Sequence, residues 1–306
     1  HPLFPDCPPA LMARALLLYN PAARSAPDPA LLKAIGLELE LAGFAAETAR
    51  SAGPGDLTRL SRSAAYEGYE RVVVCGGDGS VREAAEGLCG RETALALVPL
   101  GTANVLAREL GLPVHSPLSC AALAGRGLLA RIGLGKVSGG GVFTFCASAG
   151  LDSMAVYNVD LGIKRQTGSW AYAYSGLQCL LAPAQPLEVA TDAGARFTAA
   201  QVFAARMRRY GAGRLFLSRK AALTSPTLRL IAVSPPLAPR LPRCLFRMLR
   251  GGLEGAPGIV DAEVSSFAVE SGSPVPIQAD GDVLARTPAV FSALPDALSV
   301  VVPKTP

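Results

Sequence analysis

The chain has 306 residues, half of them hydrophobic, and 29 Lys plus Arg against 24 Asp plus Glu give it a net charge of +5. This composition excludes a disordered chain, a collagen-like chain and a coiled coil, because half of the residues can form a core and the 32 glycines follow no three-residue period. The mild excess of positive charge permits an anionic partner without requiring one. The length favours two domains over one.

The cysteines and histidines limit the chemistry further. The seven cysteines are scattered and never spaced as C-x-x-C, so they indicate neither a disulfide framework nor a zinc site, and we expect a reducing cytoplasm. Because only His1 and His115 are present, proton transfer is expected to rest mainly on carboxylates. Residues 1–11 lack the charged front and apolar run of a signal peptide, so we exclude them from the fold and take Met12 as the expected natural start. The longest uncharged stretch, 166–187, is interrupted by glycine, serine and proline, which predicts a soluble or peripheral protein.

The first part of the chain alternates short apolar strands with helical patterns. Strands are predicted at 15–19, 45–48, 71–75 and 94–98, and helices at 29–42, 55–67 and 81–88. These strands are continuously apolar, which is typical of a parallel sheet covered on both faces. Ligands of such sheets bind at the carboxyl ends of the strands.

After about residue 132 the pattern changes to short β-rich segments separated by Gly, Pro and Ser. We expect strands at 141–149, 187–191, 197–204, 228–233, 262–269, 275–279 and 298–302, with helices at 168–181 and 241–249. Several strands alternate in polarity, as in an antiparallel sheet or sandwich. The predicted fold class is therefore α/β, with an N-terminal parallel-sheet domain and a C-terminal antiparallel β-sandwich domain.

The sharpest local signal is the sequence 72–80, a strand that runs into the glycine-rich loop Gly76-Gly77-Asp78-Gly79-Ser80 before a helix starting at Val81. Such a loop lets backbone N–H groups approach phosphate oxygens at a helix N-terminus. Asp78 would act there through Mg²⁺, a water or an acceptor hydroxyl. A tight turn with Asp78 or Ser80 as helix cap explains the same residues.

Other polar loops follow the neighbouring strands. Residues 20–25 follow the first strand, Thr48 ends the second, and residues 99–104 follow the fourth. Each of these segments is also an ordinary turn former. Their convergence at one edge of a parallel sheet favours a nucleotide site.

With these motifs the sequence resembles the diacylglycerol kinase catalytic-domain superfamily, which includes sphingosine, ceramide and bacterial lipid kinases. The resemblance spans nearly the whole chain and rests on the order and spacing of five segments: 20–21, 76–80, 99–104, 149–152 and 280–282. It implies a nucleotide-binding α/β domain over 12–132, to which 290–306 return, and a lipid-binding β-sandwich domain over 133–289. It also implies an active site in the cleft between the two domains.

Carried over residue by residue, the resemblance assigns ATP binding to Asn20, Pro21, Ala22, Ala23, Arg24, Thr48, Gly76, Gly77, Asp78, Gly79, Ser80, Val81 and Thr102. It places Asp78 near the phosphates and the metal. Asp280 and Asp282 match an Asp-Gly-Glu motif in which one carboxylate accepts a proton, although Asp282 is one methylene shorter than Glu. The alternative for Asp280-Gly281-Asp282 is a hairpin turn. Asp152 would face the acceptor hydroxyl or, alternatively, cap a helix.

Two departures from the family pattern bear on metal binding. Many relatives have Asp after Gly-Thr-x-Asn, where this chain has Val105. Some relatives hold a structural Mg²⁺ with acidic residues before the strand at 228–233, whereas residues 223–227 here contain none. We therefore expect Mg²⁺ to arrive with ATP and expect no second, structural ion.

The resemblance implies transfer of the ATP γ-phosphoryl group to the hydroxyl of a lipid such as diacylglycerol, a sphingoid base or ceramide. Two alternatives stay open: a kinase of a soluble acceptor, since NAD kinases share a Gly-Gly-Asp-Gly loop, and a non-catalytic lipid-binding protein. A homodimer is compatible with the sequence.

The segment 239–250 suggests a membrane partner. It places Arg240, Arg243, Arg247 and Arg250 at helical spacings, with Leu241, Leu245, Met248 and Leu249 on the opposite face. This pattern is typical of a helix that rests in an anionic membrane interface, and equally of a surface helix that packs its apolar side on the sandwich. We expect no nucleic-acid partner, because no basic groove with aromatic residues accompanies the arginines. The expected location is the cytoplasm, with peripheral membrane contact.

Overall fold

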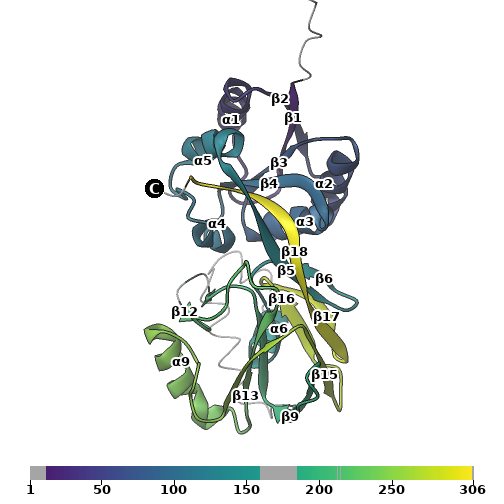
Figure 1. Cartoon of the computed structure of the whole chain (residues 1–306), viewed down its shortest axis with the longest axis vertical. Helices are drawn as coiled ribbons and strands as arrows, with labels where there is room; N and C mark the ends of the chain where they lie inside the picture. The colour runs from purple at the N-terminus through teal and green to yellow at the C-terminus, as the bar shows by residue number, and fades with distance from the viewer. Residues whose placement is uncertain (1–11, 159–184, 212, 214, 305–306) are drawn as a thin grey trace, which may run out of the picture. The chain divides into compact units, whose positions relative to one another are not determined.

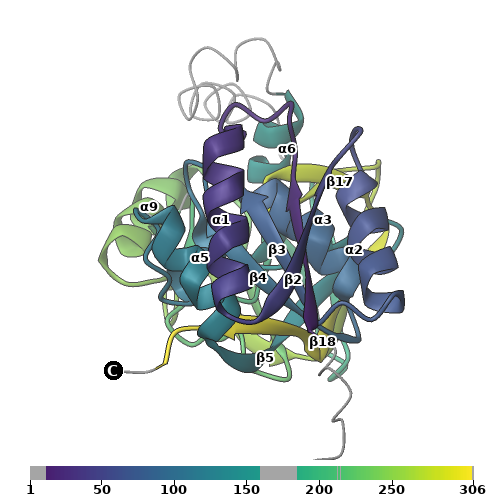
Figure 2. The ribbon, with the colours of Figure 1, turned by 90° about the horizontal axis from the view of Figure 1, so that it is seen from above.

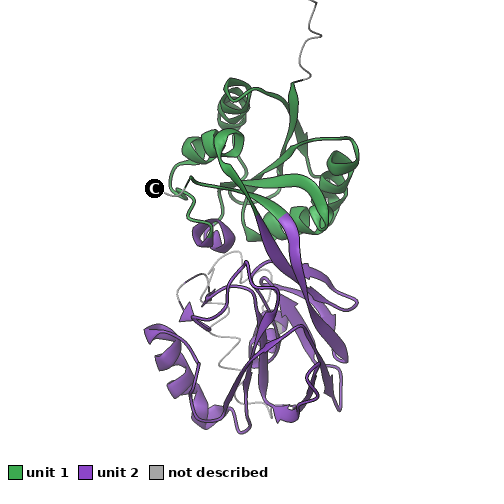
Figure 3. Ribbon diagram, in the orientation of Figure 1, with its two compact units in different colours: residues 1–101, 110–130, 299–306 green, residues 102–109, 131–298 purple. Residues whose placement is uncertain are grey.

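The computed structural model describes residues 12–304 except 159–184, 212 and 214, so the helix predicted at 168–181 lies outside the described residues. The chain forms two compact units (Figure 3). Unit 1 comprises the residues up to 101, together with 110–130 and 299 onward. Unit 2 comprises 102–109 and 131–298.

Unit 1 is built on a parallel sheet. Its strands, in order across the sheet, are β2 (Phe44–Arg50), β1 (Ala13–Tyr19), β3 (Arg71–Gly76) and β4 (Arg91–Pro99), followed by the end of β18 (Ala289–Val302). The pairs β1–β2, β1–β3 and β3–β4 are all parallel. Val72, Val73 and Val74 of β3 are completely buried, because helices cover both faces of the sheet.

Four helices cover this sheet, two on each face (Figure 2). α1 (Pro29–Leu41) and α5 (Pro117–Arg126) lie on one face, and α2 (Asp56–Tyr66) and α3 (Asp78–Leu88) lie on the other. Gly87 permits the close approach of α2 and α3, since a Cβ there would lie 2.4 Å from the carbonyl oxygen of Thr58. α5 and β5 (Leu128–Val137) were not predicted from the sequence.

Unit 2 is a β-sandwich (Figure 1). One layer is the antiparallel sheet β14 (Ile259–Val264), β13 (Leu228–Val233), β10 (Gln201–Ala205), β7 (Cys146–Gly150), β16 (Pro276–Ala279) and β17 (Asp282–Arg286). The other contains β5 (Leu128–Val137), β6 (Gly141–Phe143), β18, β15 (Ser266–Ser271), β8 (Leu187–Thr191) and β9 (Arg196–Ala199). Apolar side chains from both layers fill the core, including Phe267 and Phe291, whose stacked rings lie 4.7 Å apart. The predicted α/β fold class with a C-terminal β-sandwich is confirmed.

The remaining elements of unit 2 are short. They are α4 (Val105–Glu109), α6 (Leu151–Asn158), β11 (Arg209–Tyr210), β12 (Leu215–Phe216), the 3₁₀ turn η1 (Ala238–Arg240) and α9 (Leu241–Arg250). α4 is held by an ion pair of 3.2 Å between Glu109 and Arg208. α9 matches the helix predicted at 241–249.

Three runs that were predicted as single strands are each two strands of different layers. The run 141–149 divides into β6 and β7, 197–204 into β9 and β10, and 262–269 into β14 and β15. The breaks are only one or two residues long, and at each of them the chain passes from one layer of the sandwich to the other. Such corners are a usual way for strands to switch sheets.

Candidate functional site

The glycine-rich loop is shorter than predicted, because its second half is helical. β3 ends at Gly76 and α3 begins at Asp78, so Asp78, Gly79 and Ser80 form the first turn and the expected helix start at Val81 is wrong. Gly77 is the N-cap and has no side chain to accept from the first-turn N–H groups. These donors, together with the partial positive charge of the helix N-terminus, favour an anion such as a phosphate.

Two glycines of the loop are required by close contacts. A Cβ on Gly76 would lie 2.9 Å from the hydroxyl oxygen of Ser80, and a Cβ on Gly77 would lie 3.3 Å from the Cα of Gly101. Gly101 follows β4, so the loops after β3 and β4 touch at their backbones. A larger residue at Gly77 would push these two loops apart, and one at Gly76 would displace the side chain of Ser80.

A cavity of about 280 Å³ lies beside this turn. It is lined by residues that follow β1, β2 and β3, namely Asn20, Ala23, Ser25, Ser51, Gly53, Leu57, Gly77, Gly79, Ser80 and Glu83. The Oγ of Ser51 is buried and has no hydrogen-bond partner among the described residues, so it can meet a polar group of a ligand. Glu83 accepts a hydrogen bond of 3.1 Å from the N–H of Gly55 and thereby ties α3 to the turn before α2. The cavity lies at the carboxyl ends of the strands, where a ligand is expected.

The structure brings most of the predicted nucleotide-binding residues of unit 1 to this edge. Asn20, Ala23, Gly77, Gly79 and Ser80 line the cavity. Pro21, Ala22 and Arg24 belong to the same turn after β1, which is closed by a hydrogen bond of 2.9 Å from the N–H of Ala22 to Oδ1 of Asn20. Gly76, Asp78 and Val81 belong to the β3–α3 junction.

Thr48 and Thr102 are the predicted residues that belong to neither of these two turns, and several lining residues were not predicted. Thr48 does not end β2, which continues to Arg50, and Ser51 is the residue of this connection that lines the cavity. Thr102 belongs to unit 2. The sequence analysis did not predict four of the lining residues: Ser51, Gly53, Leu57 and Glu83. Of these, only Ser51 could have been found from the sequence pattern, because it directly follows the end of β2.

In unit 2, Asp280 and Gly281 form a two-residue hairpin turn between β16 and β17. Both residues have positive φ, +52° and +92°, and Ala279 pairs with Asp282 across the turn. Asp-Gly is a favoured sequence for such turns. The hairpin alternative is therefore correct as geometry, and it places Asp282 at the exposed start of β17.

Asp280 is buried and fully engaged by the segment between β6 and β7. Its carboxylate accepts from the N–H and hydroxyl of Thr144, at 2.6 and 2.8 Å, and from the N–H groups of Phe145 and Cys146, both at 3.1 Å. Burial raises the pKa of Asp280 to about 6, although these four hydrogen bonds oppose the shift. Asp280 therefore anchors the hairpin, while Asp282 is exposed.

Asp152, in the first turn of α6, is the centre of a polar network. Its carboxylate accepts from the hydroxyl of Ser148 at 2.6 Å, the side-chain amide of Gln201 at 2.7 Å and the hydroxyl of Tyr210 at 2.5 Å. The backbone N–H of Asp152 in turn donates to Oε1 of Gln201 at 3.2 Å. Since donors meet both carboxylate oxygens, a ligand hydroxyl would reach Asp152 only by replacing one of them.

Gln278 of β16 joins this network to the acidic hairpin. Its Nε2 donates to the hydroxyl of Ser148 at 2.8 Å and to Asp152 at 3.3 Å, while its Oε1 accepts from the N–H of Gly281 at 3.0 Å. Gln278 is 2% exposed, so these bonds are not exchanged with water. The buried side-chain amide of Gln278 thus links Asp152 to Gly281, which directly precedes Asp282.

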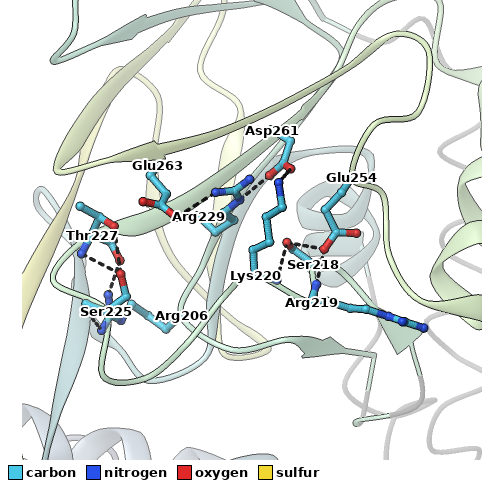
Figure 4. Close-up of polar contacts among 10 residues, drawn as sticks. All are labelled: Arg206, Ser218, Arg219, Lys220, Ser225, Thr227, Arg229, Glu254, Asp261 and Glu263. Atoms are coloured by element: carbon cyan, nitrogen blue, oxygen red, sulfur yellow. Dashed lines mark hydrogen bonds and ion pairs between the residues drawn. The ribbon is translucent and has the colours of Figure 1, made fainter.

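Arg206, which directly follows β10, extends its side chain into the loop that precedes β13 (Figure 4). The guanidinium of Arg206, which is completely buried, donates to the carbonyl oxygens of Thr227, Leu223 and Ser225 at 2.6, 2.8 and 2.9 Å. Burial lowers the pKa of Arg206 to about 10. The carbonyl oxygens of the segment 223–227 therefore bind a guanidinium, and this is the segment in which the sequence has no acidic residue.

A carboxylate beside the cavity fits a magnesium ion that is bound together with phosphates. The described residues contain no group of three or more His, Cys, Asp or Glu side chains that could hold a metal ion. Mg²⁺ commonly needs only one or two protein carboxylates when phosphates supply further ligands. Asp78, in the first turn of α3 beside the cavity, can supply one.

A helix N-terminus at the carboxyl edge of a parallel sheet and an exposed carboxylate on a hairpin are groups that a phosphotransferase can use. Residues 14–137 match the diacylglycerol kinase catalytic domain family, and residues 146–302 match the YegS C-terminal NAD kinase beta sandwich-like domain family. The chain belongs to this family of diacylglycerol and YegS-like lipid kinases, and the predicted family and kinase class are confirmed.

Individual relatives agree with this assignment. The chain is 25% identical over 297 residues to a diacylglycerol kinase of Bacillus subtilis (strain 168), covering 96% of this chain and 97% of that protein. It is 30% identical over 254 residues to a Pseudomonas putida protein named "probable lipid kinase YegS-like", covering 81% and 82% of the two chains. A crystal structure of a diacylglycerol kinase from Bacillus anthracis str. Sterne superposes with a TM-score of 0.73 over 95% of this chain and 97% of that chain; at 19% identity this likeness shows the fold alone. No helix in the described part of the chain is both long and apolar enough to cross a membrane.

Proposed function

We propose that this protein is an ATP-dependent kinase that transfers the γ-phosphoryl group to the hydroxyl of a lipid such as diacylglycerol, a sphingoid base or ceramide. The observation that carries the proposal is the cavity of unit 1, which the first turn of α3 and the ends of three parallel strands line together. Family membership supports the lipid as acceptor.

Unit 1 supplies the groups for the phosphate donor. In this proposal the N–H groups of the first turn of α3 donate to phosphate oxygens, and the missing side chain of Gly77 lets the loop after β4 lie close to that turn. Asp78 would hold the Mg²⁺ that accompanies ATP, and this ion would neutralise charge on the triphosphate. Ser51 offers its buried hydroxyl to the same ligand.

Unit 2 supplies the groups for the acceptor hydroxyl. Asp282 is the proposed proton acceptor, because it is exposed, whereas the carboxylate of Asp280 is occupied by four hydrogen bonds. Asp280 then positions the hairpin from one side and Gln278 from the other. Asp152 would help bind the acceptor hydroxyl by exchanging one of its present donors.

Phosphoryl transfer requires few other groups from the protein. Phosphoryl transfer depends mainly on holding the reacting groups in line and on balancing the charge of the transferred group. The proton of the acceptor hydroxyl has to leave, and a carboxylate within reach is sufficient to accept it.

Labelled ATP offered with diacylglycerol, sphingoid bases, ceramide, phosphatidylglycerol and NAD tests the proposal. Incorporation of label into a lipid supports it, and the identity of the product names the acceptor. Label in NAD alone would instead show a kinase of a soluble acceptor. Lipid binding without transfer to any acceptor would show a non-catalytic lipid-binding protein.

The variant Asp78→Asn tests the role of the cavity in the same assay. We expect transfer to fall at least ~100-fold with little change in thermal stability, because the substitution removes a charge from the half-buried first turn of a helix and keeps the size of the side chain. Asp28→Asn is the matched control, since Asp28 caps α1 and Asn is an equally good N-cap. Unchanged turnover in Asp78→Asn would refute the assignment.

A further inference from the structure

The surface of α9 was predicted to be either membrane-facing or packed on the sandwich, and the structure shows which side chains pack. Cys244 and Met248 are the buried residues of this helix. Leu245, Phe246 and Leu249 remain 44%, 55% and 65% exposed. The main neighbour of α9 is β12, outside the two sandwich layers, and this packing uses only part of the apolar side. The rest of that side is left open among the described residues.

Basic residues flank this exposed apolar strip. Arg243 and Arg250 are exposed, and Arg250 lies over the ring of Phe246 at 4.5 Å, which keeps a cation and an aromatic ring together at the surface. The segment 237–250 carries four arginines and no acidic residue. An apolar strip bordered by arginines fits an interface in which hydrocarbon and negative charge lie next to each other.

A cleft of about 350 Å³ at the end of α9 adds to this surface. Arg219, Arg247 and Arg250 line it together with Phe246, Gly251, Gly252 and Glu254. The one carboxylate is engaged within the protein, since Glu254 accepts from the hydroxyl of Ser218 at 2.7 Å and from the N–H of Arg219 (Figure 4). Nε of Arg247 is buried without an acceptor among the described residues. The cleft is thus a positively charged recess beside the apolar strip.

Arg219 also holds the end of the helix in place. Its guanidinium donates to the carbonyl oxygens of Gly251 and Arg250, both at 3.0 Å, and so satisfies groups that the last turn of α9 leaves open. The apolar strip and the recess therefore belong to one fixed surface, which consists of Leu245, Phe246, Leu249 and the arginines 219, 243, 247 and 250. We refer to it as the α9 surface.

We infer that the α9 surface docks this protein on a bilayer of anionic phospholipids. Leu245, Phe246 and Leu249 enter the boundary between headgroups and acyl chains, while Arg243 and Arg250 lie near lipid phosphates and the cleft accepts one headgroup phosphate. The charge of the surface selects an anionic bilayer over a neutral one or an apolar protein groove. The inference deepens the proposed function, because a kinase of bilayer lipids has to reach its acceptor at the membrane surface.

Sedimentation with vesicles of phosphatidylcholine, with or without 30% phosphatidylglycerol, tests this inference without reference to catalysis. Wild type is expected to bind the anionic vesicles and to be released as NaCl rises from about 50 to 500 mM, because exposed charges are screened by salt. Arg243→Gln combined with Arg250→Gln should weaken binding roughly ten- to thirty-fold at low salt. Leu245→Ser combined with Leu249→Ser should weaken it about ten-fold or more and leave the salt dependence in place.

Matched pairs elsewhere on the chain serve as controls. Leu37 and Leu41 of α1 are 49% and 72% exposed, and Arg62 and Arg196 are also exposed. Leu37→Ser with Leu41→Ser, and Arg62→Gln with Arg196→Gln, should bind vesicles as wild type does. Equal losses in control and α9 variants, or no binding of wild type to anionic vesicles, would overturn the inference.

A soluble short-chain acceptor separates this inference from the proposed function. The α9 variants should phosphorylate such an acceptor at the wild-type rate but lose phosphorylation of bilayer lipid in proportion to vesicle binding. Weakened vesicle binding without transfer to any acceptor would uphold the docking surface and reject the kinase activity. Normal transfer from vesicles by variants that no longer sediment with them would reject the docking surface alone.

Discussion

Replacing Arg206 by Met should destabilise unit 2 strongly. The substitution keeps a long apolar side chain but removes the guanidinium, so the carbonyl oxygens of Leu223, Ser225 and Thr227 lose their donors inside the protein. Hydrogen bonds from a charged donor contribute ~1.5–3 kcal/mol each. Loss of all three would therefore cost roughly 5–9 kcal/mol if nothing opposed it.

The cost of burying the charge opposes this loss. The pKa of Arg206 falls from 12.5 to about 10, so the charged form is disfavoured by ~3 kcal/mol, and Met does not bear this cost. The expected net decrease in the free energy of unfolding is about 2–6 kcal/mol. Hydrogen bonding outweighs the desolvation of the charge because three acceptors from one loop converge on a single side chain.

Chemical denaturation followed by circular dichroism measures this difference. Arg208→Met is the control, because Arg208 lies two residues further on and its half-exposed side chain pairs with Glu109, a surface ion pair that is worth ~1 kcal/mol or less. Gly133→Ala should act like Arg206→Met, since a Cβ there would lie 2.0 Å from the guanidinium. Equal stability of the variants at 206 and 208 would refute the reasoning. A chelator should leave the stability of the wild-type protein unchanged, which also tests the predicted lack of a structural ion.

Three further predictions concern the acidic hairpin. Asp282→Ala should lower kcat ~100-fold with the KM for ATP unchanged, and Asp282→Glu should keep activity; a change confined to that KM would make Asp282 a binding group. Gln278→Leu should lower kcat ~10-fold without changing the KM for ATP, because the N–H of Gly281 loses its acceptor. Gln278→Glu keeps that acceptor and should recover part of the loss. Equal kinetics in both variants would contradict a positioning role. The pKa of Asp280 is raised from 3.8 to about 6, so its contribution to stability is fully present below about pH 4 and is lost as the pH rises through 6. Wild type should therefore lose ~3 kcal/mol relative to Asp280→Asn between pH 4 and 7, and parallel unfolding curves across that range would argue against the shift.

The sequence predicts β1, β3 and β4 well because each of them is a largely buried apolar run bounded by turn residues, whereas most of β2 is exposed or only partly buried. Boundaries that depend on glycine are less visible. The composition of Asp78, Gly79 and Ser80 predicts a loop, yet these residues form the first turn of α3. The prediction fails because helix N-termini and tight turns favour the same small polar residues. Thr48 was placed at a strand end two residues too early, and the cavity residue Ser51 was missed for the same reason.

In unit 2 the sequence predicts the sandwich but not its corners. Apolar alternation continues almost unbroken through Ala200 and Ser265, although the chain changes layers at both residues. The N–H of Ser265 donates to the carboxylate of Asp192 at 2.7 Å, across 73 residues of sequence. No local pattern contains that partner, and the same is true of the contacts that Gln278 makes with Asp152.

The single-residue junction at Gly77 has a thermodynamic consequence. A flexible phosphate-binding loop would lose conformational entropy on binding, at about 1–2 kcal/mol for each residue that becomes ordered. Here the N–H donors belong to the first turn of α3, which follows the buried strand residues Val72 to Cys75 after a single residue. These donors are already ordered in the folded protein, so ligand binding does not have to order them. A ligand at this edge would not bear that ordering cost, so the rigidity of the sheet would raise its affinity.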